Sequence, residues 1–438
     1  MAETKIPKRI ASIVINALKG GVVPRVGLSY ITVGRKAEID ALLADIDMVM
    51  DGGATFRFVE GRYGSGKSFL LQAVRNYVMD RGFVVIDADL SPERKLHGNN
   101  GQGLATYREL ISKMSTKTRP EGGALGMILD RWLMDIEDAV EASGIHHGES
   151  AFYAECVRRQ KLALAPLNEM VRGVDFSRIL LDYSEGRAAG DSELQTRVMK
   201  WLRAEYSTRT ESKRELGVNL IITDDDWYEY VKLFAVFLHS IGYSGLMMMV
   251  DELVNIYKIV NRISRESNYE KILTMYNDAL QGKAKWLGII MCGTPECISD
   301  TRRGIYSYEA LRSRLTEGRF SKEGCSDMLA PVIKLNPLNY EEMTVLVEKL
   351  ADIHAVMFGY QRTITEKDLI LFIKAEYSRI GADSHITPRE VIRDFVELLD
   401  ILYQHPETNV GSLLGSGSFE FAKPGPADDS DSIPEFEL

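Results

Sequence analysis

Apolar and polar positions recur along the chain with two periods, which separate strand-like from helix-like segments. Short apolar runs predict five strands: one starting at Phe56, then 83–87, 246–250, 286–291 and 332–335. Most of these runs are apolar almost throughout, as strands of a parallel sheet are. Helical periodicity fills most of the intervening sequence, so we expect an α/β fold around a parallel sheet.

Helical patterns also dominate outside this core. Helices are predicted at 7–20, 37–50, 254–281, 341–351, 366–377 and 388–403. Residues from Leu104 to about Ser240 show helical periodicity alone, broken only at glycines. This stretch therefore predicts a large all-helical insertion within the core.

A glycine-rich turn follows the first predicted strand. Gly61, Gly66, Lys67 and Ser68 satisfy G-x-x-x-x-G-K-[ST], and Gly64 adds another position without a Cβ, so backbone N–H groups can surround a phosphate chain. Lys67 would reach the β- and γ-phosphates, and the Ser68 hydroxyl would ligate Mg²⁺. The other candidate positions of this nucleotide loop are Tyr63, Ser65 and Phe69. The alternative is a chance match on a tight turn, which the flanking strand and amphipathic helix disfavour.

The strand at 246–250 runs into Asp251 and Glu252. Downstream of a phosphate loop, this pattern is typical of the second half of a nucleotide site: Asp251 would hold Mg²⁺, and Glu252 would polarise the attacking water. Thr294, at the tip of the next strand, would hydrogen-bond the γ-phosphate or that water. The alternatives are a solvated strand end for the acids and an ordinary Thr-Pro turn for Thr294.

Arginines complete the expected site. Arg314, and after it Arg312, are candidates to reach the γ-phosphate of a neighbouring subunit and neutralise charge that develops in the transition state. Their segment also contains Arg302, Arg303 and Arg319. Pro388 is the expected first residue of the last helix, so Arg389 could reach back to the bound phosphates. The expected cofactors are ATP and Mg²⁺.

Two segments are candidates for nucleic-acid contacts. The exit of the second strand carries Arg94, Lys95 and His97 in a loop rich in Gly and Asn. The stretch 197–214, expected to be a helix, mixes Lys and Arg with Trp201 and Tyr206, which suits phosphate neutralisation and base stacking. A solvated loop and an amphipathic helix with a solvated face are the alternatives.

Composition limits the partners and the cellular location that we expect for the protein. The 438 residues are 45% hydrophobic and 26% charged, with a net charge of −10, which argues against wholesale coating of nucleic acid but allows a local basic channel. The four cysteines show no metal-like pairing, so a reduced cytoplasmic protein is the simplest interpretation. We find no signal peptide and no apolar run of about 20 residues, and so expect no membrane association.

The chain resembles an AAA+ ATPase of the initiator-like branch in the order of its motifs: the phosphate loop, the acid pair, Thr294 and the arginines. Three segments resemble more closely the ATP-binding proteins of BREX-type phage-defence systems, the BrxC and BrxD group. They are ALKGGVVPRVGLSYITVGR, GRYGSGKSFLLQ and YEALRSRL. The resemblance extends to about residue 400 and implies a cytosolic ATPase working beside defence partners, often with a helicase encoded nearby. The chain is far shorter than the largest members, so the functions of their extra domains do not carry over.

The resemblance also assigns parts of the chain. Val33, Gly34 and Arg35 would supply backbone contacts to adenine, the alternative being an ordinary capping turn, and the loop at 94–97 would face a ring's central channel. The expected division is N-terminal helices with an adenine-side strap at 1–55, a three-layer AAA+ P-loop core at 56–335 with the insertion at about 104–243, a helical lid at 336–408 and a disordered acidic tail at 409–438.

We therefore expect ATP hydrolysis that drives assembly or movement on nucleic acid, in a homo-oligomeric ring or filament. The competing interpretation is an ATP-dependent assembly switch or scaffold without motor activity; a small-molecule kinase is poorly supported. The tail at 428–438 resembles the acidic tip of bacterial single-stranded-DNA-binding proteins, although Glu435 separates Pro434 from Phe436. It would bind a partner such as a helicase, unless it is only a solubilising tail.

Overall fold

The structure is a computed structural model that describes residues 6–98, 100–316, 327–379 and 387–415. The chain forms two compact units. The helical unit comprises Met1–Lys36, Gly61–Ala73 and Leu335–Leu438, and the sheet unit comprises Ala37–Glu60 and Val74–Lys334. Residues 61–73, which we assigned to the core, thus group with the two ends of the chain, and the predicted domain boundaries stay a prediction.

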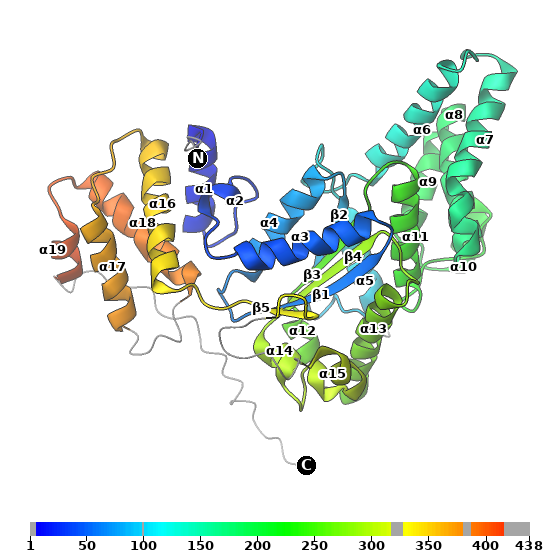
Figure 1. The fold of residues 1–438 in the computed structure, drawn as a ribbon. Coiled ribbons are helices and arrows are strands. Elements are labelled where there is room, and N and C mark those ends of the chain that lie inside the picture. Colours follow the sequence, from blue (N-terminus) through cyan, green and yellow to red (C-terminus); the bar gives the residue numbers. More distant parts are fainter. Residues whose placement is uncertain (1–5, 99, 317–326, 380–386, 416–438) are drawn as a thin grey trace. The chain divides into compact units, whose positions relative to one another are not determined.

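A parallel sheet is the centre of the sheet unit (Figure 1), as the apolar runs predict. Its strands are β1 (Ala54–Glu60), β2 (Val84–Asp89), β3 (Leu246–Asp251), β4 (Leu287–Gly293) and β5 (Val332–Lys334), in the order β2-β3-β4-β1-β5. Every residue of β1, β3 and β4 is buried. All neighbouring strands are parallel, so their carboxyl ends lie at one edge, with Glu60 beside Gly293 and Asp89 beside Asp251.

Helices accompany the sheet along the chain. They are α3 (Lys36–Met50), α5 (Gln102–Ser112), α11 (Trp227–Ser240), α12 (Val254–Tyr257), α13 (Arg262–Leu280), α14 (Pro295–Ser299), the 3₁₀ turn η2 (Ile305–Ser307) and α15 (Glu309–Leu315). A buried ion pair fixes α3 to β1, because Arg57 Nε and Nη2 lie 2.5 and 2.7 Å from the carboxylate oxygens of Asp45.

The expected single helix at 254–281 is wrong. It is interrupted between Tyr257 and Arg262, where the side chain of Asn261 accepts a hydrogen bond from Ser264 N and starts α13 as its cap. Arg265 Nη1 donates to Ile259 O at 2.7 Å, so the interruption is itself held by a side chain.

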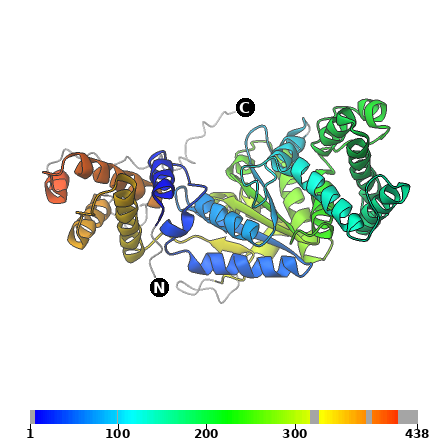
Figure 2. The same ribbon diagram turned by 90° about the horizontal axis from the view of Figure 1, so that it is seen from above.

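The arm of the sheet unit comprises α6 (Leu125–Glu141), α7 (Ser150–Leu164), the 3₁₀ turn η1 (Ala165–Glu169), α8 (Gly173–Ala189), α9 (Ser192–Leu202) and α10 (Arg209–Leu216). Figures 1 and 2 both show this arm extending away from the sheet. Its helical content agrees with the periodicity of the sequence.

The helical unit contains α1 (Lys8–Lys19), α2 (Leu28–Ile31), α16 (Tyr340–Phe358), α17 (Glu366–Arg379), α18 (Pro388–Gln404) and α19 (Val410–Gly415). Helix α4 (Lys67–Asp80) begins in this unit and ends in the sheet unit. The expected lack of fixed structure after Thr408 is wrong for residues 410–415, because Val410 is buried in the apolar cluster of this unit. The tail at 428–438, Arg319 and Cys325 lie outside the described residues.

Candidate nucleotide-binding site

The glycine-rich loop joins the end of β1 to the start of α4. Gly64 and Gly66 have φ values of +74° and +97°, which side-chain-bearing residues rarely adopt. A Cβ on Gly64 would also lie only 2.8 Å from Thr387 Oγ1. The loop therefore needs glycine for both its conformation and its contact with the start of α18.

The polar groups of the loop suit a phosphate ligand. Lys67 Nζ lies 2.6 Å from Gly61 O and 2.9 Å from Arg62 O, so its ammonium lies over the loop backbone. Ser65 Oγ is buried and has no hydrogen-bond partner within the described residues, which leaves a donor that a phosphate oxygen can satisfy. Ser68 lies in the first turn of α4, where helix N–H groups favour an anion, and Tyr63 is exposed.

Arg35 braces this loop from the N-terminal segment. It is buried, and its Nη2 donates to Ser65 O at 3.0 Å while Nη1 donates to Asn336 O at 2.9 Å. Gly34, with φ +66°, lies against Glu342, and Val33 and Phe69 pack on the apolar cluster of the helical unit. The side-chain contact of Arg35 was not predicted, and the adenine contact stays a prediction.

Arg389 belongs to the helical unit and follows Thr387, the residue that contacts the loop, by two positions. Thr387 caps α18 in a reciprocal capping box with Glu390, so Pro388 and Arg389 are the first residues of that helix, as predicted. Arg389 is exposed, and a Cβ on Gly21 would lie 3.2 Å from its Nη2. The contact of Thr387 with the loop was not predicted, although the sequence Thr-Pro-Arg-Glu is typical of a capping box at the start of a helix.

The acid pair lies at the carboxyl end of β3, in the sheet unit. Asp251 is buried, and its Oδ1 accepts a hydrogen bond from Glu252 N at 2.8 Å. Glu252 is half-buried, and its φ of +62° lies in the left-handed region. A non-glycine residue in this region is uncommon and is found where surrounding contacts enforce it.

Thr294 directly follows β4 and is buried at the start of α14. Its Oγ1 lies 3.1 Å from the sulfur of Cys297, a contact that the sequence did not predict. Cys297, Cys292 and Cys156 are buried.

The candidate arginines of α15 are exposed. Arg314 Nη1 donates to Ala310 O at 2.5 Å on its own helix, and Arg312 lies 3.5 Å from Glu309. Arg303 instead donates to Tyr257 O and Ile259 O and so braces the segment after the acid pair.

In the ranges that the structure describes, no group of three or more His, Cys, Asp or Glu residues could hold a metal ion. A nucleotide-bound Mg²⁺ does not require such a group, because it takes most of its ligands from phosphates and water. Ser68 and Asp251 belong to different units, and their joint role stays a prediction.

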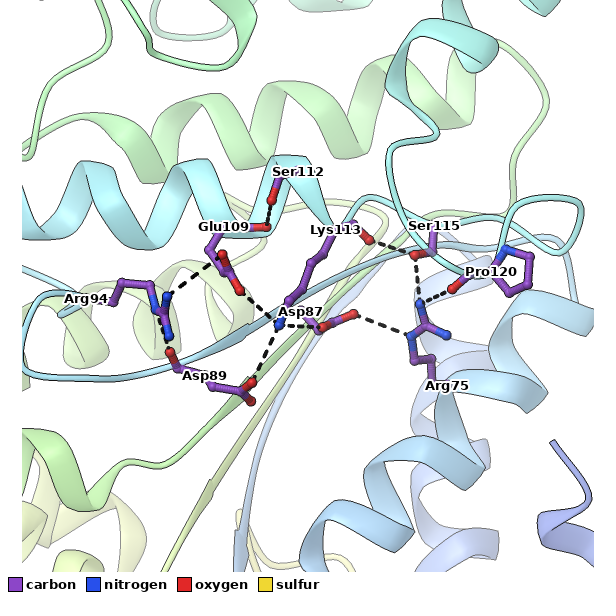
Figure 3. A network of polar contacts seen from close by, with 9 residues as sticks. All are labelled: Arg75, Asp87, Asp89, Arg94, Glu109, Ser112, Lys113, Ser115 and Pro120. Carbon is purple, nitrogen blue, oxygen red and sulfur yellow. Dashed lines mark hydrogen bonds and ion pairs between the residues drawn. The ribbon is translucent and has the colours of Figure 1, made fainter. Parts of the chain in front are cut away.

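A polar network surrounds the carboxyl end of β2 (Figure 3). Lys113 Nζ lies 3.5 Å from carboxylate oxygens of both Asp87 and Asp89 and 2.9 Å from Glu109. Burial alone would lower the pKa of Lys113, but the hydrogen bond to Glu109 and the charges of the two aspartates raise it. Arg94 joins this network by donating to Asp89 O at 2.9 Å.

The basic stretch at 197–214 is not a single helix but parts of α9 and α10 with a break between them. Trp201 and Tyr206 are 1% and 2% exposed, so the expected stacking surface is wrong. Trp201 Nε1 donates to Leu220 O, and the Tyr206 hydroxyl donates to Glu215. Lys200 lies 2.6 Å from Glu211 Oε1, which raises the Lys200 pKa and lowers the pKa of Glu211.

A comparison of the sequence with known protein families identifies the family that the chain matches. Residues 6–418 match the family described as BREX system ATP-binding protein BrxC/D. No curated protein matches the chain. Across the described parts of the chain, no helix is long and apolar enough to cross a membrane.

Proposed function

The chain belongs to the family of BREX system ATP-binding proteins BrxC/D, and on that premise we propose that it hydrolyses ATP with an AAA+ type core. Membership in this family assigns the chain ATP binding and a part in BREX phage defence. Hydrolysis, assembly into a homo-oligomer and action on DNA are further steps of the proposal.

The strand order carries the proposal. Strand β4 lies between β1, which leads into the phosphate loop, and β3, which ends in the acid pair. Two strand spacings separate β1 from β3, or roughly 10 Å. Because β1 leads into the loop and β3 ends in the acid pair, this strand order supports the proposed roles of Lys67 in phosphate binding and of Glu252 in activating water.

Each residue then has a defined task. Lys67 and the loop N–H groups bind the β- and γ-phosphates, and Ser68 and Asp251 would hold Mg²⁺, which neutralises phosphate charge when bound. Glu252 orients the attacking water and accepts its proton, and Thr294 hydrogen-bonds the γ-phosphate or that water. Arg389 contacts the phosphates from the same chain.

Two substitutions test the assignment by separating binding from chemistry. Lys67→Ala should weaken ATP binding because it removes a ground-state interaction with phosphate, whereas Glu252→Gln should keep binding and lower kcat by about 100-fold or more. ATP titration and steady-state turnover measure the two effects. A Glu252→Gln protein with normal turnover would show that another group activates water.

Substitution of Arg314 tests whether a neighbouring subunit contributes an arginine to each ATP site. Arg314→Ala should abolish most hydrolysis without unfolding the chain, because the arginine is exposed and its target lies on a neighbour. Mixing it with Lys67→Ala should restore part of the activity, since a mixed oligomer can pair an intact loop with an intact arginine. Arg131→Ala, at an exposed arginine of helix α6, is the matched control and should leave hydrolysis unchanged. Co-assembled mixtures without rescue would contradict a shared site.

The same preparations separate a motor from an assembly switch. DNA-stimulated turnover with translocation supports the motor, while slow turnover with ATP-dependent assembly supports the switch. A helicase or another defence partner that binds the tail at 428–438 stays part of the proposal and is tested by pull-down with a truncated chain.

A further inference from the structure

Three hydrogen bonds enforce the left-handed backbone of Glu252. Its own N–H donates to Asp251 Oδ1 at 2.8 Å, its carbonyl accepts from Asn255 N at 3.0 Å, and the next residue, Leu253, donates to Cys292 O at 3.1 Å. Elsewhere in the described ranges, only Arg172, Ala204 and Trp286 among non-glycine residues have a positive φ. Such a conformation persists where several contacts over-determine it, and it tends to occur at functional sites.

The side chain of Asn255 adds a contact that reaches a second element. Its Nδ2 donates to Leu90 O at 2.8 Å and to Glu252 O at 3.3 Å, so one amide joins the acid pair to the exit of β2. Leu90 N donates in return to Asp251 O at 3.1 Å. The residue after β2 thus both accepts a hydrogen bond from the segment after β3 and donates one to the end of β3.

The exit of β2 is anchored on its other side by the network in Figure 3. Lys113 contacts Asp87 and Asp89, and Arg94 donates to Asp89 O. Leu90 therefore lies between an anchored strand end and the β2 exit loop, residues 91–98, which carries Arg94, Lys95 and His97. The hydrogen bonds of Asn255 to Leu90 O and Glu252 O therefore connect Glu252 to the residue that precedes this loop.

We propose that Asn255 is a positioning residue for ATP hydrolysis. Its amide holds Glu252 in the left-handed conformation and couples this residue to the β2 exit loop, so that a polyanion bound to the loop changes the rate of hydrolysis. This inference rests on the proposed role of Glu252 as the residue that activates water.

Steady-state ATP hydrolysis by Asn255→Asp and Asn255→Ala tests the proposal. A carboxylate has nearly the same size as the amide but cannot donate to the two carbonyl groups, and alanine removes the donor entirely. We expect kcat to fall by about 10-fold or more while ATP affinity stays within about twofold, because Asn255 acts on a residue needed only in the transition state. The same change at exposed Asn219, Asn219→Asp, should leave both quantities unchanged.

Adding DNA to the same assays gives a second measurement. DNA should change the wild-type rate and should have little effect on either Asn255 variant. Thermal unfolding of each variant identifies loss of fold, and the alanine variant replaces the aspartate variant if only the latter unfolds.

The outcomes separate this inference from the proposed function. A wild-type protein without ATP hydrolysis overturns both. Active wild type beside folded Asn255 variants with unchanged kcat overturns the positioning role alone. A parallel fall of kcat and ATP affinity also overturns it, because that pattern indicates a general disturbance of the nucleotide site.

Discussion

Two regions of the sheet unit contain residue types that predict a functional site: the acid pair at the carboxyl end of β3 and the basic, aromatic stretch of the arm. They differ in how their side chains and backbone are held in the structure. At the carboxyl edge of the sheet, Glu252 has a left-handed backbone held by contacts from Asp251, Cys292 and Asn255. In the arm, Trp201 and Tyr206 are core residues, and Lys200 pairs with acids of the arm itself.

The difference shows which sequence signals are specific. The acid pair was identified by its position at a strand end downstream of a phosphate loop, and strand ends are fixed by the sheet. The nucleic-acid contact of the arm was instead predicted from composition alone, and a mixture of basic and aromatic residues is found in a helical core as readily as on a nucleic-acid surface.

The largest effect is expected at Trp201, in the core of the arm. Trp201→Ala should lower the free energy of unfolding by about 3–5 kcal/mol, because it removes a fully buried ring and leaves a cavity. Chemical denaturation followed by circular dichroism measures the decrease. Arg209→Ala, an exposed change nearby, should shift stability by less than about 0.5 kcal/mol. An equally mild effect at Trp201 would show that its ring is not part of the core.

A smaller effect is expected at Glu252, where two substitutions both remove the carboxylate. Glu252→Gly should be more stable than Glu252→Ala by about 1 kcal/mol, because glycine adopts the left-handed conformation without a Cβ clash. The same pair of substitutions at exposed Glu270, in the interior of helix α13, should rank in the opposite order because glycine disfavours helices. Equal stability of the two Glu252 variants would mean that the backbone there is unstrained.

The smallest effect is expected for DNA binding by the arm. Charge reversal at exposed Arg209 and Lys213 should leave the slope of log K against log salt unchanged. Reversal at Arg94 and Lys95 should instead reduce the slope by about 0.9 for each phosphate that the variant no longer neutralises. Fluorescence titrations at several salt concentrations measure both slopes. A reduced slope for the arm variant would restore the arm as a nucleic-acid surface.

The parallel sheet, the helical arm and the phosphate loop could be predicted from the sequence, because each has a local signature. Apolar runs mark buried strands, helical periodicity marks the arm, and the spacing from Gly61 to Ser68 follows from how backbone N–H groups surround phosphate. The family match over residues 6–418 agrees with the resemblance that these segments carry.

Which side chains support the site and which form the core depends on tertiary packing and could not be predicted from the sequence. The bonds from Arg35 to Ser65 and from Asn255 to Leu90 join residues far apart in sequence, and no local pattern specifies such partners. The burial of Trp201 depends on how the arm helices pack, which composition does not reveal. The left-handed backbone of Glu252 arises in the same way, since glutamate has no intrinsic preference for it and tertiary contacts must impose it.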